Sequence, residues 1–276
     1  MAPSFDQQAL VQDISQNKKE TALEKLSQGT PLSGVPKFTD VELQRQHMLN
    51  HMAGAFRVFA RHGFVEGMSG HISLRDPEFP DRFWTNPLGL HFALITPSDM
   101  ILVDESGIAV GGNTSRPANA AGFLIHAALH KARPDVNAAC HFHSTYGKAW
   151  SAFAQPLEML NQDVAMFYGK AQSVYKDFGG VVLHEEESAA LATALGKDGK
   201  GMILRNHGLL TVGDTVDEAA YLFLLMEKSC QIQLAADAAA AVGRQKVYID
   251  DEAARFTFES TSEAVSFPCT SFQSTD

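Results

Sequence analysis

Short apolar runs with the spacing of β-strands alternate with helical segments along most of this chain, which limits the folds open to it. Strands are expected over 71–75, 83–85, 92–95, 101–103, 108–110, 136–143, 180–183 and 201–212, the last broken by 206–208; helices are expected over 40–62, 119–133, 144–153, 185–195 and 216–241. Such alternation favours an α/β fold, in which helices flank a mixed sheet around a single core. The length of 276 residues is enough to bury that core.

Two of the expected helices have clear end signals. Thr215 and Glu218 have the spacing of a capping box, with a hydroxyl at the N-cap and a carboxylate three residues later, before 216–241. Gly63 follows 40–62 and can take the left-handed conformation that closes many helices. These signals predict where the first core helix ends and where the longest helix begins.

The two ends of the chain differ from its middle. Turn formers and polar residues predict an N-terminal tail at 1–38, with a candidate charged helix over 15–28, and a Ser/Thr-rich C-terminal tail at 246–276. One domain is therefore expected at 39–245.

Composition narrows the class of protein. The net charge of −10 and pI near 5.5 disfavour non-specific binding to nucleic acid or to anionic lipid, because both need basic patches. No apolar run reaches eighteen residues, and the N-terminus lacks the apolar core of a secretory signal. Cys140, Cys230 and Cys269 lie far apart, which fits a reducing compartment better than a disulfide framework. We therefore expect a soluble, cytoplasmic protein that binds neither nucleic acid nor a membrane.

Two histidines at the end of an apolar strand are the main chemical signal. His141 and His143 are two residues apart, so on a strand both imidazoles lie on one face while Cys140 and Phe142 lie on the other. Paired imidazoles there need partners, and either neighbouring hydrogen-bonding groups or a metal could satisfy them. A metal needs a further ligand, and the best candidate is His207, because Asn206-His-Gly208 interrupts an apolar strand.

Two more histidines have helical spacing. His126 and His130 are four residues apart on an expected helix, but the glutamate of an HExxH metalloprotease motif is absent. We therefore expect them to pack in the core or to support a metal ligand from behind.

Five short motifs follow one another in an order that identifies a family: Gly70-His-Ile-Ser-Leu-Arg75, Leu94-Ile-Thr-Pro-Ser-Asp99, Ala132-Arg-Pro-Asp-Val136, His141-Phe-His-Ser144 and Arg205-Asn-His-Gly-Leu209. Over 40–241 the chain resembles the class II aldolase/adducin head-domain family. The resemblance implies a three-layer α/β/α sandwich around a mixed, largely antiparallel sheet, and a homotetramer with active sites between subunits. It also implies one divalent transition metal on His141, His143 and His207, with zinc expected before iron or manganese.

The chain departs from the sugar-phosphate aldolases of that family at the catalytic carboxylate. Those enzymes carry a glutamate four residues before a helical histidine. Counting back from His126 gives Gly122, which has no side chain to move a proton.

The phosphate-binding positions of those aldolases are also altered. Those aldolases bind phosphate with two turns and a pair of serines. The corresponding segments here are 70–73, 96–99 and 120–121. The second turn ends in Asp99, and two alanines replace the serine pair. A phosphate dianion needs donors and positive charge, so we expect a non-phosphorylated hydroxy- or keto-acid as the substrate. Ser73, Ser98 and Asn119, in or beside these segments, are candidate substrate-binding residues.

The expected chemistry is that of a metal-dependent carbon–carbon lyase. A metal held by three neutral imidazoles keeps its double charge and can stabilise an enolate in a retro-aldol cleavage or decarboxylation. A proton carrier is also needed. His71, Asp99 and Tyr175 are candidates, with His71 favoured because the family turn that contains it faces the substrate.

Two alternatives use the same residues. The chain is similar to the adducin-type branch, which includes a non-haem iron oxygenase of aminocoumarin biosynthesis; that similarity extends through 162–163, 185–187 and 226–230. An oxygenase with the same three histidines is therefore the first alternative. An adducin-like binding module without catalysis is the second, although binding alone would not need three convergent imidazoles.

The apolar length of 221–234 exceeds what one core face needs, which predicts an oligomer.

Overall fold

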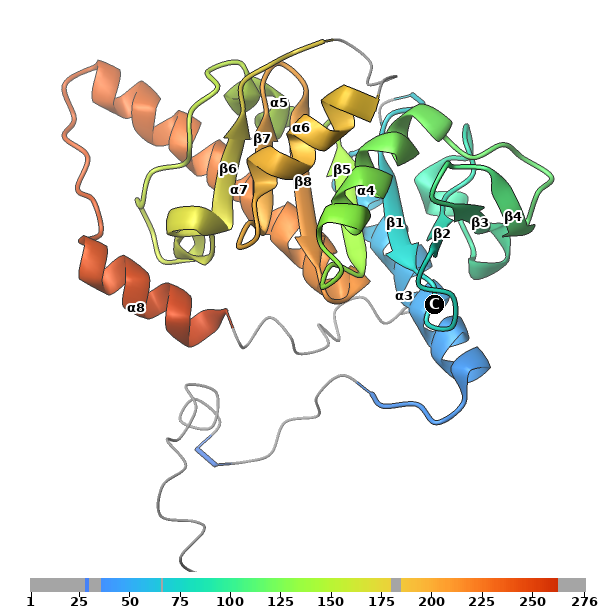
Figure 1. Ribbon diagram of the computed structural model, residues 1–276. Helices are drawn as coiled ribbons and strands as arrows, with labels where there is room; N and C mark the ends of the chain where they lie inside the picture. Colours follow the sequence, from blue (N-terminus) through green and yellow to red (C-terminus); the bar gives the residue numbers. More distant parts are fainter. Residues whose placement is uncertain (1–27, 30–35, 66, 180–184, 263–276) are drawn as a thin grey trace, which may run out of the picture.

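A single eight-stranded sheet runs through the computed structural model, which describes residues 28–29, 36–65, 67–179 and 185–262. The strand order is β4-β3-β2-β1-β5-β8-β7-β6 (Figure 1), and every pair is antiparallel except β6 with β7. The strands are β1 (His71–Arg75), β2 (Arg82–Thr85), β3 (Ile101–Asp104), β4 (Ala109–Gly112), β5 (Ala138–Phe142), β6 (Gln172–Tyr175), β7 (Gly201–Leu204) and β8 (Gly208–Gly213).

Helices cover both faces of this sheet. The α-helices are α3 (Val41–Arg61), α4 (Ala120–Ala132), α5 (Thr145–Ser151), α6 (Glu185–Leu195), α7 (Val216–Ala241) and α8 (Asp251–Thr261); short 3₁₀ helices are η2 (Phe92–Leu94), η3 (Pro97–Asp99), η4 (Asp163–Phe167) and η5 (Gly169–Ala171). In Figure 1, α4 and α6 lie in front of the sheet, and α3 and α7 lie behind it. The prediction of a three-layer α/β/α sandwich around a mixed, largely antiparallel sheet is confirmed.

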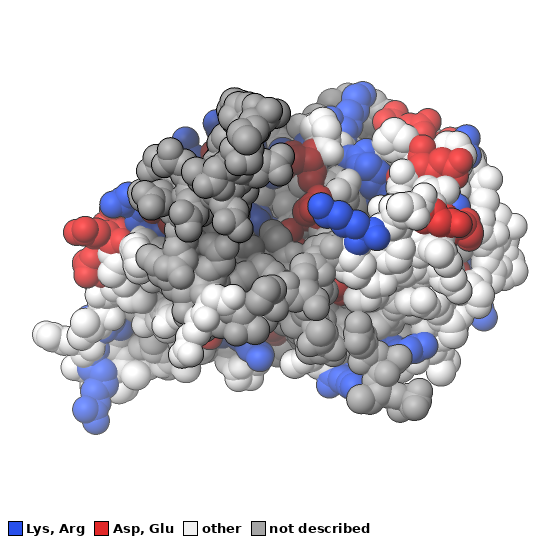
Figure 2. Space-filling model, turned by 90° about the horizontal axis from the view of Figure 1, so that it is seen from below, with Lys and Arg blue, Asp and Glu red and all other residues white. Residues whose placement is uncertain are grey.

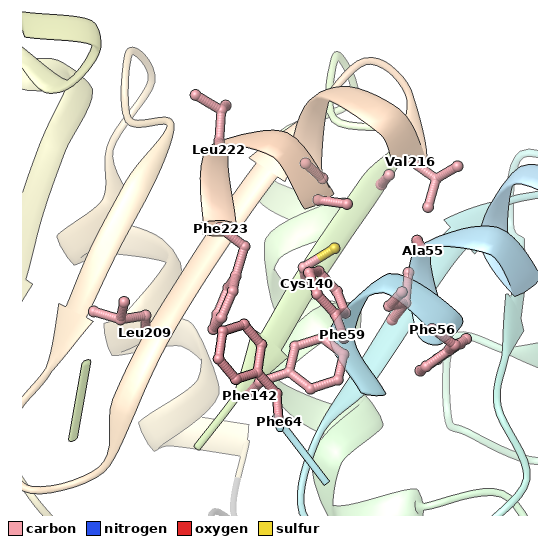
Figure 3. Packing of buried hydrophobic residues seen from close by; sticks show 14 of the residues in the cluster. Ala55, Phe56, Phe59, Phe64, Cys140, Phe142, Leu209, Val216, Leu222 and Phe223 are labelled. Atoms are coloured by element: carbon pink, nitrogen blue, oxygen red, sulfur yellow. The ribbon is translucent and has the colours of Figure 1, made fainter. Parts of the chain in front are cut away.

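The central strand β5 is anchored from behind by aromatic rings. Phe142 of β5 meets Phe59 of α3 and Phe223 of α7, with ring centroids 4.3 and 5.4 Å away and edge-on geometry (Figure 3). All three side chains are completely buried. Burying each ring contributes about 2–3 kcal/mol, and edge-to-face contacts add about 1 kcal/mol each. The face of β5 opposite Phe142 is thereby held in a fixed position.

The hydroxyl half of the expected capping box is present, whereas the Glu218 carboxylate accepts from the backbone N–H of Asp214 and not from that of Thr215. Thr215 accepts from the backbone N–H of Glu218 at the start of α7. Gly63, just past the end of α3, has a φ of +79°. The end of the first core helix and the start of the longest helix were therefore correctly predicted.

The segment 92–95 is not a strand, so that prediction was wrong. Phe92 and Ile95 are buried while Leu94 is 65% exposed. Burial at every third residue is the period of a 3₁₀ turn, not that of a strand, and η2 forms here. The apolar run was mistaken for a strand because it is too short for its period to be clear.

Three other segments differ from expectation. The expected strand 201–212 is a hairpin of β7 and β8, in which Asn206 turns the chain with a φ of +55°. Strand β6 was not predicted, because Gln172-Ser-Val-Tyr175 is short and half polar. The segment 246–276, expected as a tail, contains α8, which Tyr168 contacts by donating to Asp251. The expected strand 180–183 and almost all of the helix 15–28 lie outside the described residues.

Charged side chains of both signs lie interspersed over the described part of the face shown in Figure 2. This mixture agrees with the modest net negative charge of the chain. None of the described helices has the length and apolar character needed to cross a membrane.

Candidate metal centre

Strand β5 and the residue directly after it carry the first two histidines of the site. Cys140 and Phe142 belong to the core on the α3–α7 side, whereas Ala139 belongs to the core on the α4–α6 side. His141 shares the face of Ala139 because side chains alternate along a strand. His143 follows directly after the strand, and its ring centroid lies 5.2 Å from that of His141. The two-residue spacing thus brings the imidazoles together as the alternation predicted.

The β7–β8 hairpin supplies the third histidine. The turn presses against the end of β5: a Cβ at Gly208 would lie 2.8 Å from the backbone oxygen of Phe142. The missing side chain therefore allows an approach that any other residue would block. His207 comes to rest with its ring centroid 4.7 Å from that of His141 and 4.8 Å from that of His143.

The three imidazoles can converge on one ion. One ring nitrogen from each lies within 4.8 Å of the corresponding nitrogens of the other two. His141 donates from Nδ1 to the backbone oxygen of Leu209 at 2.9 Å, which leaves its Nε2 lone pair for a metal. Metal ligation requires neutral imidazoles. Burial, reinforced by neighbouring histidines, lowers the pKa of His141, and burial with His143 lowers the pKa of His207 to about 4. The donor set fits a divalent transition metal.

A cavity of about 530 Å³ opens above these histidines. Its described lining is Met68, Ser69, Gly70, His71, Asn119, Gly122, Ile125, His141, His143, Lys148, Phe178, Asn206 and His207. The size suits a small organic ligand. The described lining includes one lysine, Lys148.

His71 lies beside the metal-binding histidines but outside their group. It pairs with His141 across β1 and β5, with ring centroids 5.0 Å apart. Burial and the surrounding imidazoles hold the pKa of His71 well below its usual range. A Cβ added at Gly122 would lie 2.4 Å from His71 Nε2 and Cδ2. The imidazole therefore fills the space that a side chain at 122 would need.

The other candidate residues are dispersed. Asn119 lines the cavity and caps α4 by accepting from the backbone N–H of Gly122. Ser73 is completely buried behind His71, and its hydroxyl lies 2.6 Å from His126 Nδ1.

Three more candidates, like Ser73, are not among the described lining residues. Asp99 accepts from the backbone N–H and the hydroxyl of Thr96 within its own turn, at 2.9 and 2.6 Å, and the Ser98 hydroxyl lies 2.9 Å from the Thr96 hydroxyl. Tyr175 is buried in the α4–α6 core. The structure thus brings His71 and Asn119 to the cavity and leaves Ser73 and these three elsewhere.

Several residues near the site were not found from the sequence. Lys148 and Phe178 line the cavity, and each comes from a segment without a motif. Glu227 of α7 is buried and accepts from the Ser144 hydroxyl and from the backbone N–H groups of Tyr146 and Gly147, at 2.5, 2.8 and 2.6 Å. This carboxylate caps α5 directly after His143. Its position inside a long helix gave no signal of that role.

Comparisons with known proteins agree with this geometry. Residues 50–234 match the family model described as Class II Aldolase and Adducin N-terminal domain. The Meiotically up-regulated gene 14 protein of Schizosaccharomyces pombe is 47% identical, over 78% of this chain and 82% of that protein. Decarboxylase NovR of Streptomyces niveus is 44% identical, over 74% and 75% of the two chains.

Two further similarities concern activity and structure. The 4-hydroxy-3-prenylphenylpyruvate oxygenase/4-hydroxy-3-prenylbenzoate synthase of Streptomyces roseochromogenus subsp. oscitans is 44% identical, over 74% of this chain and 73% of that protein. A solved structure, L-fuculose 1-phosphate aldolase from Glaciozyma antarctica PI12, superposes with a TM-score of 0.77 at 42% identity, covering 91% of this chain and 94% of that one.

Proposed function

The chain belongs to the class II aldolase and adducin N-terminal domain family, and we propose that it is a metal-dependent carbon–carbon lyase of the retro-aldol or decarboxylase type. Its substrate would be a non-phosphorylated hydroxy- or keto-acid. One divalent transition metal would bind His141, His143 and His207, with zinc the first expectation and iron or manganese next. The observation that carries the proposal is the convergence of these three imidazoles within 4.8 Å at the base of a cavity.

The ion and the residues around the three histidines have separate proposed roles. A divalent ion at this position supplies stabilisation for negative charge that develops on a carbonyl oxygen. Lys148 lines the cavity and is the proposed contact for the carboxylate of an acid substrate. Asn119 and Gly122 form the rim beside His71, where the reacting carbon chain would lie.

His71 is the proposed proton carrier. In a retro-aldol cleavage its Nε2 takes the proton of the substrate hydroxyl, the carbon–carbon bond breaks, and the same proton returns to the carbanion carbon. In a decarboxylation carbon dioxide leaves from the carboxylate, and the carbanion carbon takes a proton that comes from water through His71 Nε2, which then regains its lone pair. The position of His71 against Gly122 supports this role, because the imidazole occupies the neighbourhood where the sugar-phosphate aldolases carry their glutamate.

The environment of Asp99 supports an unphosphorylated substrate. Its carboxylate uses both the backbone N–H and the hydroxyl of Thr96. These donors are therefore engaged within the turn, and a phosphate approaching it would also meet the negative charge of Asp99. The solved relative named as an L-fuculose 1-phosphate aldolase makes a sugar phosphate the necessary comparison in any substrate panel.

An oxygenase is the second candidate. The relative named for prenylphenylpyruvate oxygenation is as similar to this chain as the relative named a decarboxylase. Three imidazoles differ from the usual two-histidine, one-carboxylate iron site but do not exclude iron. A binding module without turnover is the third, and it gives no reason for the three imidazoles to converge.

Metal analysis followed by an activity panel tests the proposal. Protein purified anaerobically without chelator is expected to hold about one equivalent of transition metal per chain. His143→Ala should lose it, and His62→Ala, at an exposed histidine at the end of α3, should keep it. Cleavage or decarboxylation of an acid without oxygen uptake supports the lyase.

Other results of the same panel overturn parts of the proposal. Substrate-dependent oxygen uptake with iron bound replaces the lyase by the oxygenase. Efficient cleavage of L-fuculose 1-phosphate overturns the substrate class. Protein that binds no metal and turns over no substrate indicates the binding module.

The assembly and location are also proposals. We expect a cytoplasmic homotetramer, in which the apolar part of α7 is covered by another subunit; Ile232 of this helix is 43% exposed in the single chain. Sedimentation that gives only a monomer would contradict the assembly.

A further inference from the structure

A buried line of hydrogen bonds extends away from the cavity behind His71. His71 Nδ1 lies 2.9 Å from His126 Nε2, and His126 Nδ1 lies 2.6 Å from the Ser73 hydroxyl. The same hydroxyl lies 2.7 Å from His130 Nε2, and His130 Nδ1 lies 3.0 Å from the backbone oxygen of Val136. The four side chains are at most 5% exposed. We call this line the relay.

The direction of the relay is set at its inner end. A backbone carbonyl only accepts, so His130 must carry its hydrogen on Nδ1 and donate to Val136. Burial lowers the pKa of His130 to about 3, so the ring is neutral near pH 7 and its Nε2 has no hydrogen. The Ser73 hydroxyl must then donate to that nitrogen.

The remaining steps follow because each group has one hydrogen to give. The Ser73 hydrogen is directed to His130, so its oxygen accepts from His126 Nδ1. Burial also holds the pKa of His126 well below its usual range, so this neutral ring accepts at Nε2. His71 must therefore donate from Nδ1, and its own Nε2 is left as a lone pair.

That nitrogen lies at the cavity. A Cβ at Gly122 would lie 2.4 Å from His71 Nε2, so a side chain there would cover this nitrogen, and both residues line the cavity. His71 is not a member of the group of three that could share a metal. No hydrogen-bond partner for its Nε2 is found among the described residues. The lone pair therefore faces the space where a ligand would lie.

We propose that Ser73, His126 and His130 are positioning residues, which fix His71 in the Nδ1–H tautomer and so keep its Nε2 able to accept a proton from a bound molecule. The use of that lone pair in catalysis rests on the proposed function, whereas the tautomer does not. Without the relay, either ring nitrogen of His71 could carry the hydrogen. A ring with hydrogen on Nε2 cannot begin a retro-aldol cleavage, because the nitrogen that must take the hydroxyl proton already holds one.

The tautomer can be measured directly. Magic-angle-spinning NMR of the full chain, labelled with ¹⁵N in its histidine rings, distinguishes nitrogens that carry hydrogen from those that do not. The His71 signals are identified by their loss in His71→Gln. In the unaltered, metal-free protein at pH 7.5, His71, His126 and His130 should all carry hydrogen on Nδ1 only. Hydrogen on Nε2 of His71 overturns the proposal without any further variant.

Ser73→Ala breaks the relay at its centre. His71 should then show both tautomers, and kcat should fall at least tenfold while metal content and KM change less than twofold. The matched control is Thr85→Val, which removes a buried hydroxyl directly across β1 and β2 from Ser73; Thr85 donates only to the backbone oxygen of Ile72. It should leave the His71 tautomer unchanged. Ser73→Thr retains the hydroxyl and should restore the single tautomer.

The outcomes separate the two proposals. A single His71 tautomer in Ser73→Ala overturns the relay, whatever the activity. A relay that behaves as expected in a protein without lyase activity leaves the relay intact and overturns the proposed function. If Ser73→Ala does not fold, the measurement on the unaltered protein still decides.

Discussion

Replacing Gly122 by alanine tests whether His71 fills the space beside α4. In an open helical position this change stabilises a protein by up to about 1 kcal/mol, because alanine is the better helix former. Here the new Cβ would lie 2.4 Å from His71, and that ring is held by His126 and packed on His141. Overpacking of this kind costs about 1–3 kcal/mol. We therefore expect Gly122→Ala to destabilise the protein by about 1 kcal/mol.

The sign should reverse when the ring is removed. In a His71→Ala background the space is vacant, so Gly122→Ala should stabilise by about 0.5–1 kcal/mol. Urea unfolding of the metal-free proteins, at one protein concentration, gives the four free energies of this cycle. Both proteins that carry His71→Ala leave His126 without its partner, so this penalty cancels when they are compared with each other. The expected coupling is about 2 kcal/mol, and effects of the two changes that add within about 0.5 kcal/mol would refute the steric argument.

Three other predictions concern the supports of the site. His130 stays neutral in the folded protein down to about pH 3, whereas in the unfolded chain it binds a proton below about pH 6.5. The contribution of His130 to the free energy of unfolding is therefore lost as the pH falls from about 6.5 towards 3. The loss is about 1 kcal/mol between pH 7 and 5.5, and His130→Asn should reduce the slope measured by urea unfolding. Glu227→Gln should destabilise by about 2 kcal/mol, because the amide must turn an N–H toward a buried donor; Lys228→Gln, at the exposed neighbour, should have no effect in the same assay. Gly208→Ala should weaken metal binding at least about tenfold in a titration by pushing His207 away from β5, and unchanged affinity would contradict that close approach.

Local periodicity was enough to predict the main elements. α3 and α7 have end signals in their own sequence, and the alternation in β5 separates His141 from Phe142. The interruption at 206–208 indicated a change of direction, although the hairpin itself was not recognised. These features depend on residues a few positions apart, which is the range over which sequence patterns carry information.

The environment of His71 could not be predicted in the same way. Its partner His126 is 55 residues away, and the two meet only because β1 pairs with β5 in a register that places His71 opposite His141. The four-residue spacing of His126 and His130 indicated a supporting role without showing what they support. The capping role of Glu227 could not be predicted either, since its three donors lie 80 to 83 residues earlier in the chain. Contacts across the sheet and between layers decide these positions.

The placement of the site on the sheet has a consequence for how the family can diversify. The three proposed metal ligands lie at the end of β5 and on the adjoining β7–β8 hairpin, whereas the proposed proton carrier and its relay lie on β1 and α4. Substitutions on β1 and α4 can therefore replace one acid–base apparatus by another without disturbing the ion. On the proposed function, His71 beside Gly122 moves the proton from one half of the sheet, and the three imidazoles hold the ion from the other half, so each half can be altered and tested on its own.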